Sequence, residues 1–233
     1  MKKLGLIGGT GPESTLMYYR ELNRRIDALT GQKQMPEIVI ESVDFRKMWG
    51  MVEARRYDEL SDYLAQEAAN LKAAGAEVIS MTAATTHIVY DEVCRKSGIP
   101  LVSIPKAVAD EAVARGIRKV GLLGTIFTME QAYMKTDLIN AGVEVYVPDE
   151  ADRKLVAERI LTELELGTVK ESTLLEFRTI IKKMQQAHGI EAVILGCTEL
   201  PLLLNPDNCP VLCLDSVEIH INDLIRRVTL PLL

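Results

Sequence analysis

Two stretches of the sequence follow one pattern: GAEVISMTAATTHIVYD at residues 75–91 and GIEAVILGCTELPLLL at residues 189–204. Each begins with a glycine, continues with a short apolar run that is typical of a buried parallel strand, and ends in a turn that leads to a helix. When the two glycines are set in register, the ninth residue falls at the carboxyl end of each predicted strand. That residue is Ala83 in the first stretch and Cys197 in the second.

The sequence around these stretches also repeats, in the same order. KKLGLIGG at residues 2–9 matches RKVGLLGT at an offset of 116, and the two stretches quoted above are offset by 114. IPLVSIPKAVAD at residues 99–110 resembles CPVLCLDSVEIH at an offset of 110. Any two βα units look partly alike, but three matches with nearly constant offsets favour a duplication.

The alternation of short apolar runs with amphipathic segments, such as 59–74, is typical of α/β folds with parallel sheets. We predict strands at 2–8, 36–43, 76–82, 100–104, 118–124, 143–147, 190–196 and 210–214. They form two similar Rossmann-like halves related by a pseudo-twofold axis, with domains at 1–107 and 108–214. A C-terminal helix, 215–233, is expected to pack on the first.

Ligands of parallel α/β sheets bind beyond the carboxyl ends of the strands. We therefore expect an active site in a cleft between the halves, formed by strand ends at Gly9–Thr10, Ala83–Ala84–Thr85, Thr125–Ile126 and Cys197–Thr198. The loop GGTGPEST at 8–15 lacks the spacing of a dinucleotide fingerprint, so it is either a tight turn or a cradle for a carboxylate.

Composition narrows the class of protein. The chain has 233 residues and a net charge of −6, so nothing in it favours binding to nucleic acid or to an anionic membrane. It has no apolar run of membrane-spanning length. The four cysteines show no metal-site or CxxC spacing, and we expect no metal and a cytoplasmic location in which they stay thiols.

Cys197 is the sharpest candidate for chemistry. A thiol at a helix N-terminus has a lowered pKa, and Thr198 and Glu199 follow it in a helix-capping context. Cys209 and Cys213 are interpreted instead as buried, inert cysteines.

The roles of the other candidates stay open. His87 either orients a group in the pocket or packs its helix, and His188 and His220 look like surface or packing positions. The segment with Arg46 and Trp49 is either a lid that presents an arginine to a second carboxylate or a solvated charged helix. The cations available for such a carboxylate are Arg46, Arg55 and Lys170.

The segments LGLIGGTGPEST, SVDF, TTHIVYDEV, LLGTIFTMEQAYM and above all VILGCTELPLLL resemble the aspartate/glutamate racemase family, from residue 3 to about residue 225. The resemblance implies a two-domain α/β isomerase, often a homodimer, that inverts the α-carbon of an acidic amino acid without pyridoxal phosphate, metal or other cofactor. It implies that Cys197 donates and accepts the proton. From their positions at or just after the strand ends, we expect Thr10, Ala84, Thr85, Thr198 and Glu199 to bind substrate.

The family's first motif is cysteine-asparagine-threonine-x-histidine, and the run Ala83–His87 falls on it. Thr85 and His87 match, whereas Ala83 and Ala84 do not. Racemisation removes a proton from one face of the α-carbon and returns one to the other, which calls for an acid/base group on each side. Ala83 has no proton to transfer.

Three hypotheses follow from the lack of an acid/base group at Ala83. The chain is a weakened or trapped aspartate or glutamate racemase, or a single-cysteine decarboxylase of the arylmalonate type, or a non-catalytic protein that binds acidic amino acids.

Overall fold

The structure is a computed structural model that describes residues 1–230. The described residues form two compact units: residues 1–103 with residues 220–230, and residues 104–219. The last three residues of the predicted C-terminal helix, 231–233, lie outside the described residues.

The sheet of the first unit has three parallel strands: β1 (Leu4–Gly8), β2 (Ile38–Ser42) and β3 (Val78–Met81), in the order β2-β1-β3. All five residues of the central strand β1 are buried. Because the three strands are parallel, their carboxyl ends all lie at one edge of the sheet.

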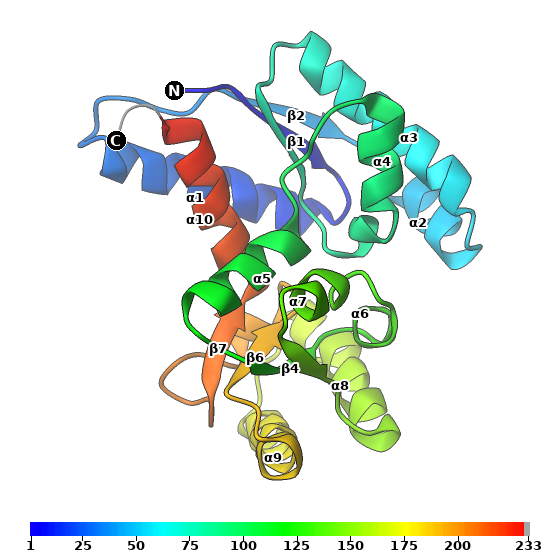
Figure 1. The fold of residues 1–233 in the computed structure, drawn as a ribbon, viewed down its shortest axis with the longest axis vertical. Coiled ribbons are helices and arrows are strands. Elements are labelled where there is room, and N and C mark those ends of the chain that lie inside the picture. Colours follow the sequence, from blue (N-terminus) through cyan, green and yellow to red (C-terminus); the bar gives the residue numbers. More distant parts are fainter. Residues whose placement is uncertain (231–233) are drawn as a thin grey trace. The chain divides into compact units, whose positions relative to one another are not determined.

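Helices pack on this sheet through their apolar stripes. The helix α3 (Tyr57–Ala73) covers most of the amphipathic segment at 59–74, and the side chains of its apolar stripe are buried: Leu60, Leu64, Ala68 and Leu71. A Cβ atom on Gly5 of β1 would lie 2.8 Å from the Cβ of Ala76, so glycine permits this close packing. The other helical elements of the unit are α1 (Pro12–Leu29), α2 (Phe45–Glu53), η1 (Thr85–Val89), α4 (Tyr90–Ser97) and most of α10 (Ser216–Thr229), which crosses α1 in Figure 1.

The sheet of the second unit has four parallel strands: β4 (Lys119–Leu123), β5 (Glu144–Tyr146), β6 (Ala192–Leu195) and β7 (Leu212–Asp215), in the order β5-β4-β6-β7. Its apolar core includes the helix residues Phe177 and Ile181 and the strand residues Val193 and Leu195. The unit also contains α5 (Ile104–Ala114), α6 (Ile126–Glu130), α7 (Thr136–Asn140), α8 (Glu150–Thr162), η2 (Leu164–Leu166), α9 (Glu171–His188) and η3 (Leu200–Leu202).

The prediction of two parallel-sheet α/β halves is confirmed, and the strand order repeats along the chain. The predicted strand at 100–104 is wrong. Only Val102 pairs, in a single parallel bridge with Ser80, and α5 begins at Ile104. Pro100 cannot donate to a strand ladder, and Pro105 favours the first turn of a helix, so the segment has little room to extend as a strand. At the offset of 110, this bridge corresponds to Leu212, the first residue of β7.

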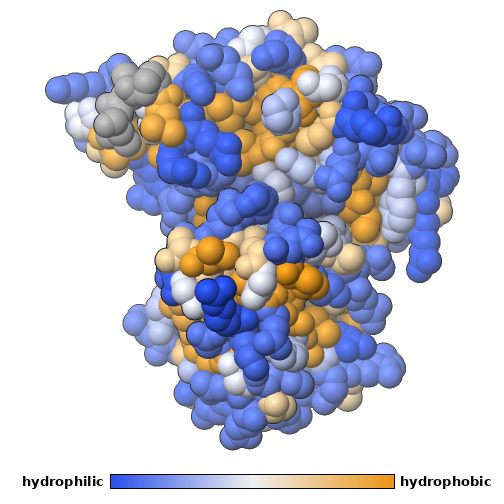
Figure 2. Space-filling view, viewed as in Figure 1, coloured by the Kyte–Doolittle hydropathy of each residue, from blue (hydrophilic) through white to orange (hydrophobic). Residues whose placement is uncertain are grey.

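Within residues 1–230, no helix combines the length and apolar character needed to cross a membrane. On the face of the molecule shown in Figure 2, hydrophobic residues form separate areas among hydrophilic ones.

Candidate active site

The carboxyl edge of the first sheet is held together by hydroxyl groups. The Oγ1 atom of Thr82, just after β3, lies 3.2 Å from that of Thr10 and 3.3 Å from that of Thr15. Ser14 Oγ donates to the carbonyl of Thr82 over 2.7 Å, and the amide of Gly9 donates to Thr15 Oγ1 over 2.9 Å. Thr10 is therefore buried in a fixed network, and the centre of that network is Thr82, which sequence analysis did not select.

The next loop carries the five residues that fall on the family's first motif. The carbonyl of Ala83 accepts hydrogen bonds from Thr86 Oγ1 over 2.8 Å and from His87 Nδ1 over 3.0 Å. His87 is buried, and desolvation lowers its pKa to about 4, so it is neutral at physiological pH. It donates from Nδ1 and holds the loop in place. Ala83, Ala84 and Thr85 stay partly exposed.

Below this loop, the strand β3 is tied to helix α10. Ser80 Oγ donates to the carbonyl of Val102 over 2.7 Å, so it accepts from His220 Nε2, 3.0 Å away. The other ring nitrogen, Nδ1, then accepts from the Tyr18 hydroxyl over 2.7 Å. Burial lowers the pKa of His220 to about 3, which keeps it neutral. Of the two alternatives given by sequence, surface or packing, His220 takes the packing position.

Cys197 lies in the turn between β6 and η3, and its side chain is partly exposed. The thiol donates to Glu199 Oε2 over 2.7 Å. The expectation of a lowered pKa is wrong: burial, followed by the negative charge of Glu199, raises the pKa of Cys197 well above its usual value. The element that follows is a three-residue 3₁₀ turn, which is too short to supply the dipole of an α-helix.

Two further features surround Cys197. Gly196 lies so close to β4 that a Cβ atom there would be 2.9 Å from the carbonyl of Leu123, so the turn needs glycine. The carboxyl group of Glu165, in η2, has its pKa raised by burial and by the charge of Glu199. Sequence analysis missed Glu165, because it follows no strand and belongs to no motif. Thr198, beside Cys197, is partly exposed.

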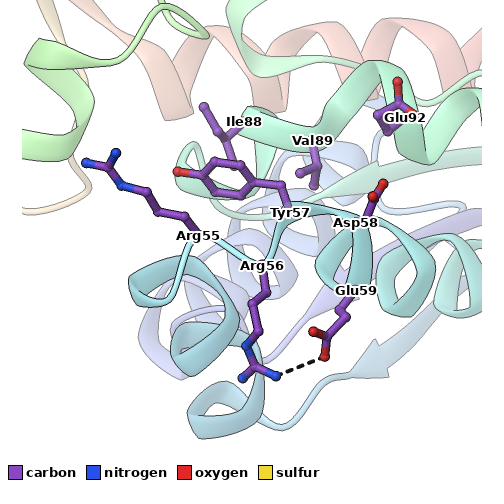
Figure 3. A pocket seen from close by; sticks show the side chains of 8 residues that line it. All are labelled: Arg55, Arg56, Tyr57, Asp58, Glu59, Ile88, Val89 and Glu92. Atoms are coloured by element: carbon purple, nitrogen blue, oxygen red, sulfur yellow. Dashed lines mark hydrogen bonds and ion pairs between the residues drawn. The ribbon is translucent and has the colours of Figure 1, made fainter.

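Of the three cations considered from sequence, Arg55 lines a cavity. This cavity of about 450 Å³ lies in the first unit, between the α2–α3 connection and the η1–α4 segment (Figure 3). The helix α3 ends just before the start of β3, so its first residues lie at the carboxyl edge of the sheet. The segment η1 follows the carboxyl end of β3, so the cavity between these two segments is also at that edge. Its lining residues are Arg55, Arg56, Tyr57, Asp58, Glu59, Ile88, Val89 and Glu92.

The charges that line the cavity are mostly paired. Arg56 pairs with Glu59 over 2.9 Å, as the dashed line in Figure 3 shows, and Glu92 pairs with Arg95. Within residues 1–230, no carboxylate lies within ion-pair distance of Arg55. Lys170, by contrast, pairs with Glu163 over 3.0 Å.

The segment that carries Arg46 is the helix α2. Arg46 and Trp49 are both exposed, and Trp49 stacks on Phe45 with 6.1 Å between ring centres.

Comparison with known proteins decides the family. The sequence model described as Asp/Glu/Hydantoin racemase matches residues 7–224. The chain belongs to this family. Its fold superimposes with a TM-score of 0.93 on a crystal structure of a candidate Asp/Glu racemase from Yersinia pestis, at 38% identity over 98% of this chain and 99% of that one.

Two further comparisons agree with membership of the racemase family. An aspartate racemase homologue from Pyrococcus horikoshii OT3 has a TM-score of 0.88 and 40% identity, over 98% of this chain and all of that one. The broad specificity amino-acid racemase RacX of Bacillus subtilis is 21% identical over 91% of this chain and 92% of its own.

For a member of a racemase family, this edge chemistry is one-sided. The thiol of Cys197 lies within hydrogen-bonding distance of the Glu199 carboxylate, and together these two groups can give and take a proton. Ala83 has a methyl group, and the nearby histidine is buried and neutral. Within residues 1–230, no group of three or more His, Cys, Asp or Glu side chains could hold a metal ion.

Proposed function

We propose that this protein is a cofactor-independent isomerase that acts at the α-carbon of aspartate or glutamate, with Cys197 as its proton carrier and slow inversion because Ala83 carries no acid or base. The observation that carries the proposal is the hydrogen bond from the Cys197 thiol to Glu199, at a strand end of a chain that belongs to the racemase family.

The first step is activation of the thiol. With a raised pKa, Cys197 is a thiol in the free protein at neutral pH. The α-ammonium group of a bound amino acid brings a positive charge near Cys197, which lowers the pKa of its thiol. The thiol proton then passes to Glu199, and the thiolate takes the α-proton of the substrate.

The carbanion that results is stabilised through the α-carboxylate, on which charge develops. Amide groups at strand ends and hydroxyls of the partly exposed Thr85 and Thr198 are suited to donate to it. Thr10 supports this edge through Thr82. Return of a proton on the opposite face then depends on water or on Thr85, which are poorer acids than a thiol, so inversion is slow.

For the second carboxylate of the substrate we propose Arg55. It lines the cavity at the edge that also carries the Ala83–His87 loop, and it has no carboxylate partner within residues 1–230. The cleft between the halves, the homodimer and the cytoplasmic location stay predictions. Analytical ultracentrifugation tests the dimer.

A second candidate is favoured by one observation, the absence of a proton-carrying side chain at Ala83. A decarboxylase that protonates a carbanion on one face needs only Cys197. Loss of carbon dioxide from an aryl- or alkylmalonate, with no exchange at amino acids, would favour this candidate.

The test is incorporation of solvent deuterium at the α-carbon of L- and D-aspartate and L- and D-glutamate, followed by NMR, with optical rotation measured in parallel. We expect exchange that is faster than net inversion. Cys197→Ala should lower exchange by at least about 10³-fold, since it removes the proton carrier. The control, Cys94→Ser, changes a partly exposed thiol on α4 and should leave exchange unchanged.

Each outcome of this experiment decides between hypotheses. Exchange with full inversion at equal rates would show that a second acid/base group works opposite Cys197. Exchange that survives Cys197→Ala would contradict the proposal. Binding of aspartate without any exchange would identify a non-catalytic binding protein.

A further inference from the structure

The turn that carries Cys197 rests on a threonine from the neighbouring strand connection. Thr128 lies in α6, which follows β4, and its side chain is buried. A Cβ atom on Gly196 would be 3.0 Å from the Cγ2 methyl of Thr128, and a Cβ atom on Gly124 would be 2.9 Å from the same methyl. Gly124 directly follows β4, and Gly196 directly follows β6. The methyl group of Thr128 is therefore packed between the ends of two paired strands.

Hydrogen bonds fix the orientation of this methyl group. Thr128 Oγ1 lies 3.1 Å from Thr125 Oγ1 and 3.0 Å from the hydroxyl of Tyr133. Tyr133 is itself buried, and its ring contacts that of Phe127 with 5.8 Å between ring centres. Because the hydroxyl and the methyl of a threonine turn together about one side-chain torsion, holding the hydroxyl also holds the methyl against the two glycines.

The contact reaches Cys197 through one residue of backbone. The amide of Gly196 donates to the carbonyl of Leu123 over 2.8 Å, which ties the turn to β4. The next residue is Cys197, whose thiol donates to Glu199 over 2.7 Å. A shift of Gly196 toward α6 would therefore move the sulfur relative to its carboxylate partner. A displacement of about 1 Å in a reacting group can cost on the order of 10²-fold in rate.

We propose that Thr128 is a positioning residue for Cys197. Its methyl group supports Gly196 and so holds the thiol where it can reach both Glu199 and the α-carbon of the substrate. The effect on catalysis rests on the proposed function, whereas the effect on the thiol itself does not depend on it.

Two substitutions separate the methyl group of Thr128 from its hydroxyl group. Thr128→Ser keeps the hydroxyl and removes the methyl, so Gly196 can move into the space and the thiol is held less tightly to Glu199. We expect alkylation of Cys197 by iodoacetamide at pH 8 to become severalfold faster. The kcat for deuterium exchange should fall by about tenfold, with KM nearly unchanged. Thr128→Val keeps the methyl, so it should unfold at lower urea but change both rates by less than about twofold.

Alkylation has to be measured at Cys197 alone. Cys209 and Cys213, which sequence analysis interpreted as buried, are partly exposed free thiols, so that interpretation is wrong. Cleavage before aspartate releases residues 152–206, which contain Cys197 and no other cysteine. The mass of this peptide, followed over time, gives the rate at the one thiol.

The first unit offers a matched control. A Cβ atom on Gly8 would be 2.6 Å from the Cγ2 methyl of Thr15, so Thr15→Ser removes the same kind of contact beside a strand end that carries no cysteine. It should lower the urea midpoint as Thr128→Ser does, but it should leave the alkylation rate of Cys197 at that of the parent chain.

Urea unfolding of every variant ensures that folded proteins are compared. Parent-like alkylation in Thr128→Ser, equal acceleration in Thr128→Ser and Thr128→Val, or equal acceleration in Thr15→Ser would each overturn the proposal. If the parent chain exchanges no α-proton but Thr128→Ser alone accelerates alkylation, the positioning of the thiol is supported and the proposed function fails.

Discussion

The loops that follow β3 and β6 occupy corresponding positions in two sheets of the same strand order, but their polar side chains bond to different kinds of partner. After β3, the polar groups bond to the backbone: Thr86 and His87 both contact the carbonyl of Ala83. After β6, the thiol of Cys197 bonds to the side chain of Glu199. A duplicated backbone therefore fixes where chemistry can occur, whereas the side chain at one position decides whether it does.

The first unit contains two buried histidines, and from them we predict the largest effect, which is on the free energy of unfolding at low pH. His87 and His220 are buried and neutral in the first unit, with the pKa lowered by burial to about 4 and about 3. In the unfolded chain each has a pKa near 6.5, so below that pH the unfolded state binds more protons than the folded state. The contribution of the two neutral histidines to the free energy of unfolding is therefore fully present above about pH 6.5. It is lost as the pH falls toward the folded pKa values, by about 1.4 kcal/mol per pH unit for each histidine.

Urea unfolding at pH 7.5, 6.5, 5.5 and 4.5 measures this loss. His220→Gln should reduce the slope below pH 6.5 by about half, because one of two titrating groups is removed. The control is His188→Gln, at the exposed end of α9, which should not change the slope. An unchanged slope in His220→Gln would contradict the assignment of a neutral buried His220.

The next effect concerns the difference between the two loops directly. Ala83→Cys places a thiol at the position that corresponds to Cys197, so it should raise the rate of aspartate or glutamate inversion by on the order of 10²-fold. The measurement is optical rotation at saturating substrate. Ala84→Cys is the matched control, since it places the same thiol one residue later in the same partly exposed loop. Equal gains in both variants would mean that Ala83 is not the special position.

A smaller effect is expected at the cavity in the first unit. Arg55→Gln should raise the KM for aspartate by about tenfold, because it removes one charged hydrogen-bonding partner of a carboxylate, and it should leave kcat nearly unchanged. Arg56→Gln changes the neighbouring guanidinium, which already pairs with Glu59, and should alter KM little. If the two variants behave alike, Arg55 does not bind the second carboxylate.

The smallest effect is a change in thiol reactivity. After burial, the negative charge of Glu199 is the next cause of the raised pKa of Cys197. Glu199→Gln removes that charge, so the pKa should fall and alkylation of Cys197 by iodoacetamide at pH 8 should become severalfold faster. Deuterium exchange should slow in the same variant, because no carboxylate accepts the thiol proton. Glu165→Gln is the control and should accelerate alkylation less, since Glu165 contributes least to the raised pKa. Slower alkylation in Glu199→Gln would refute this account.

The amino-acid sequence by itself determined the two α/β halves, the parallel strands and the correspondence of Ala83 with Cys197. Strand periodicity and the nearly constant offset between the repeats can both be read directly from the order of the residues. It also led to the family through motifs that lie at strand ends. It failed at 100–104, where pairing with Ser80 and the start of α5 decided the outcome.

Only the tertiary structure decided the electrostatics. The pKa of Cys197 depends on burial and on the charges of Glu199 and Glu165. The hydrogen bonds of His220 join side chains that are 140 and 202 residues apart in the chain. Desolvation and long-range contacts arise from packing, and for that reason no sequence spacing could have predicted them.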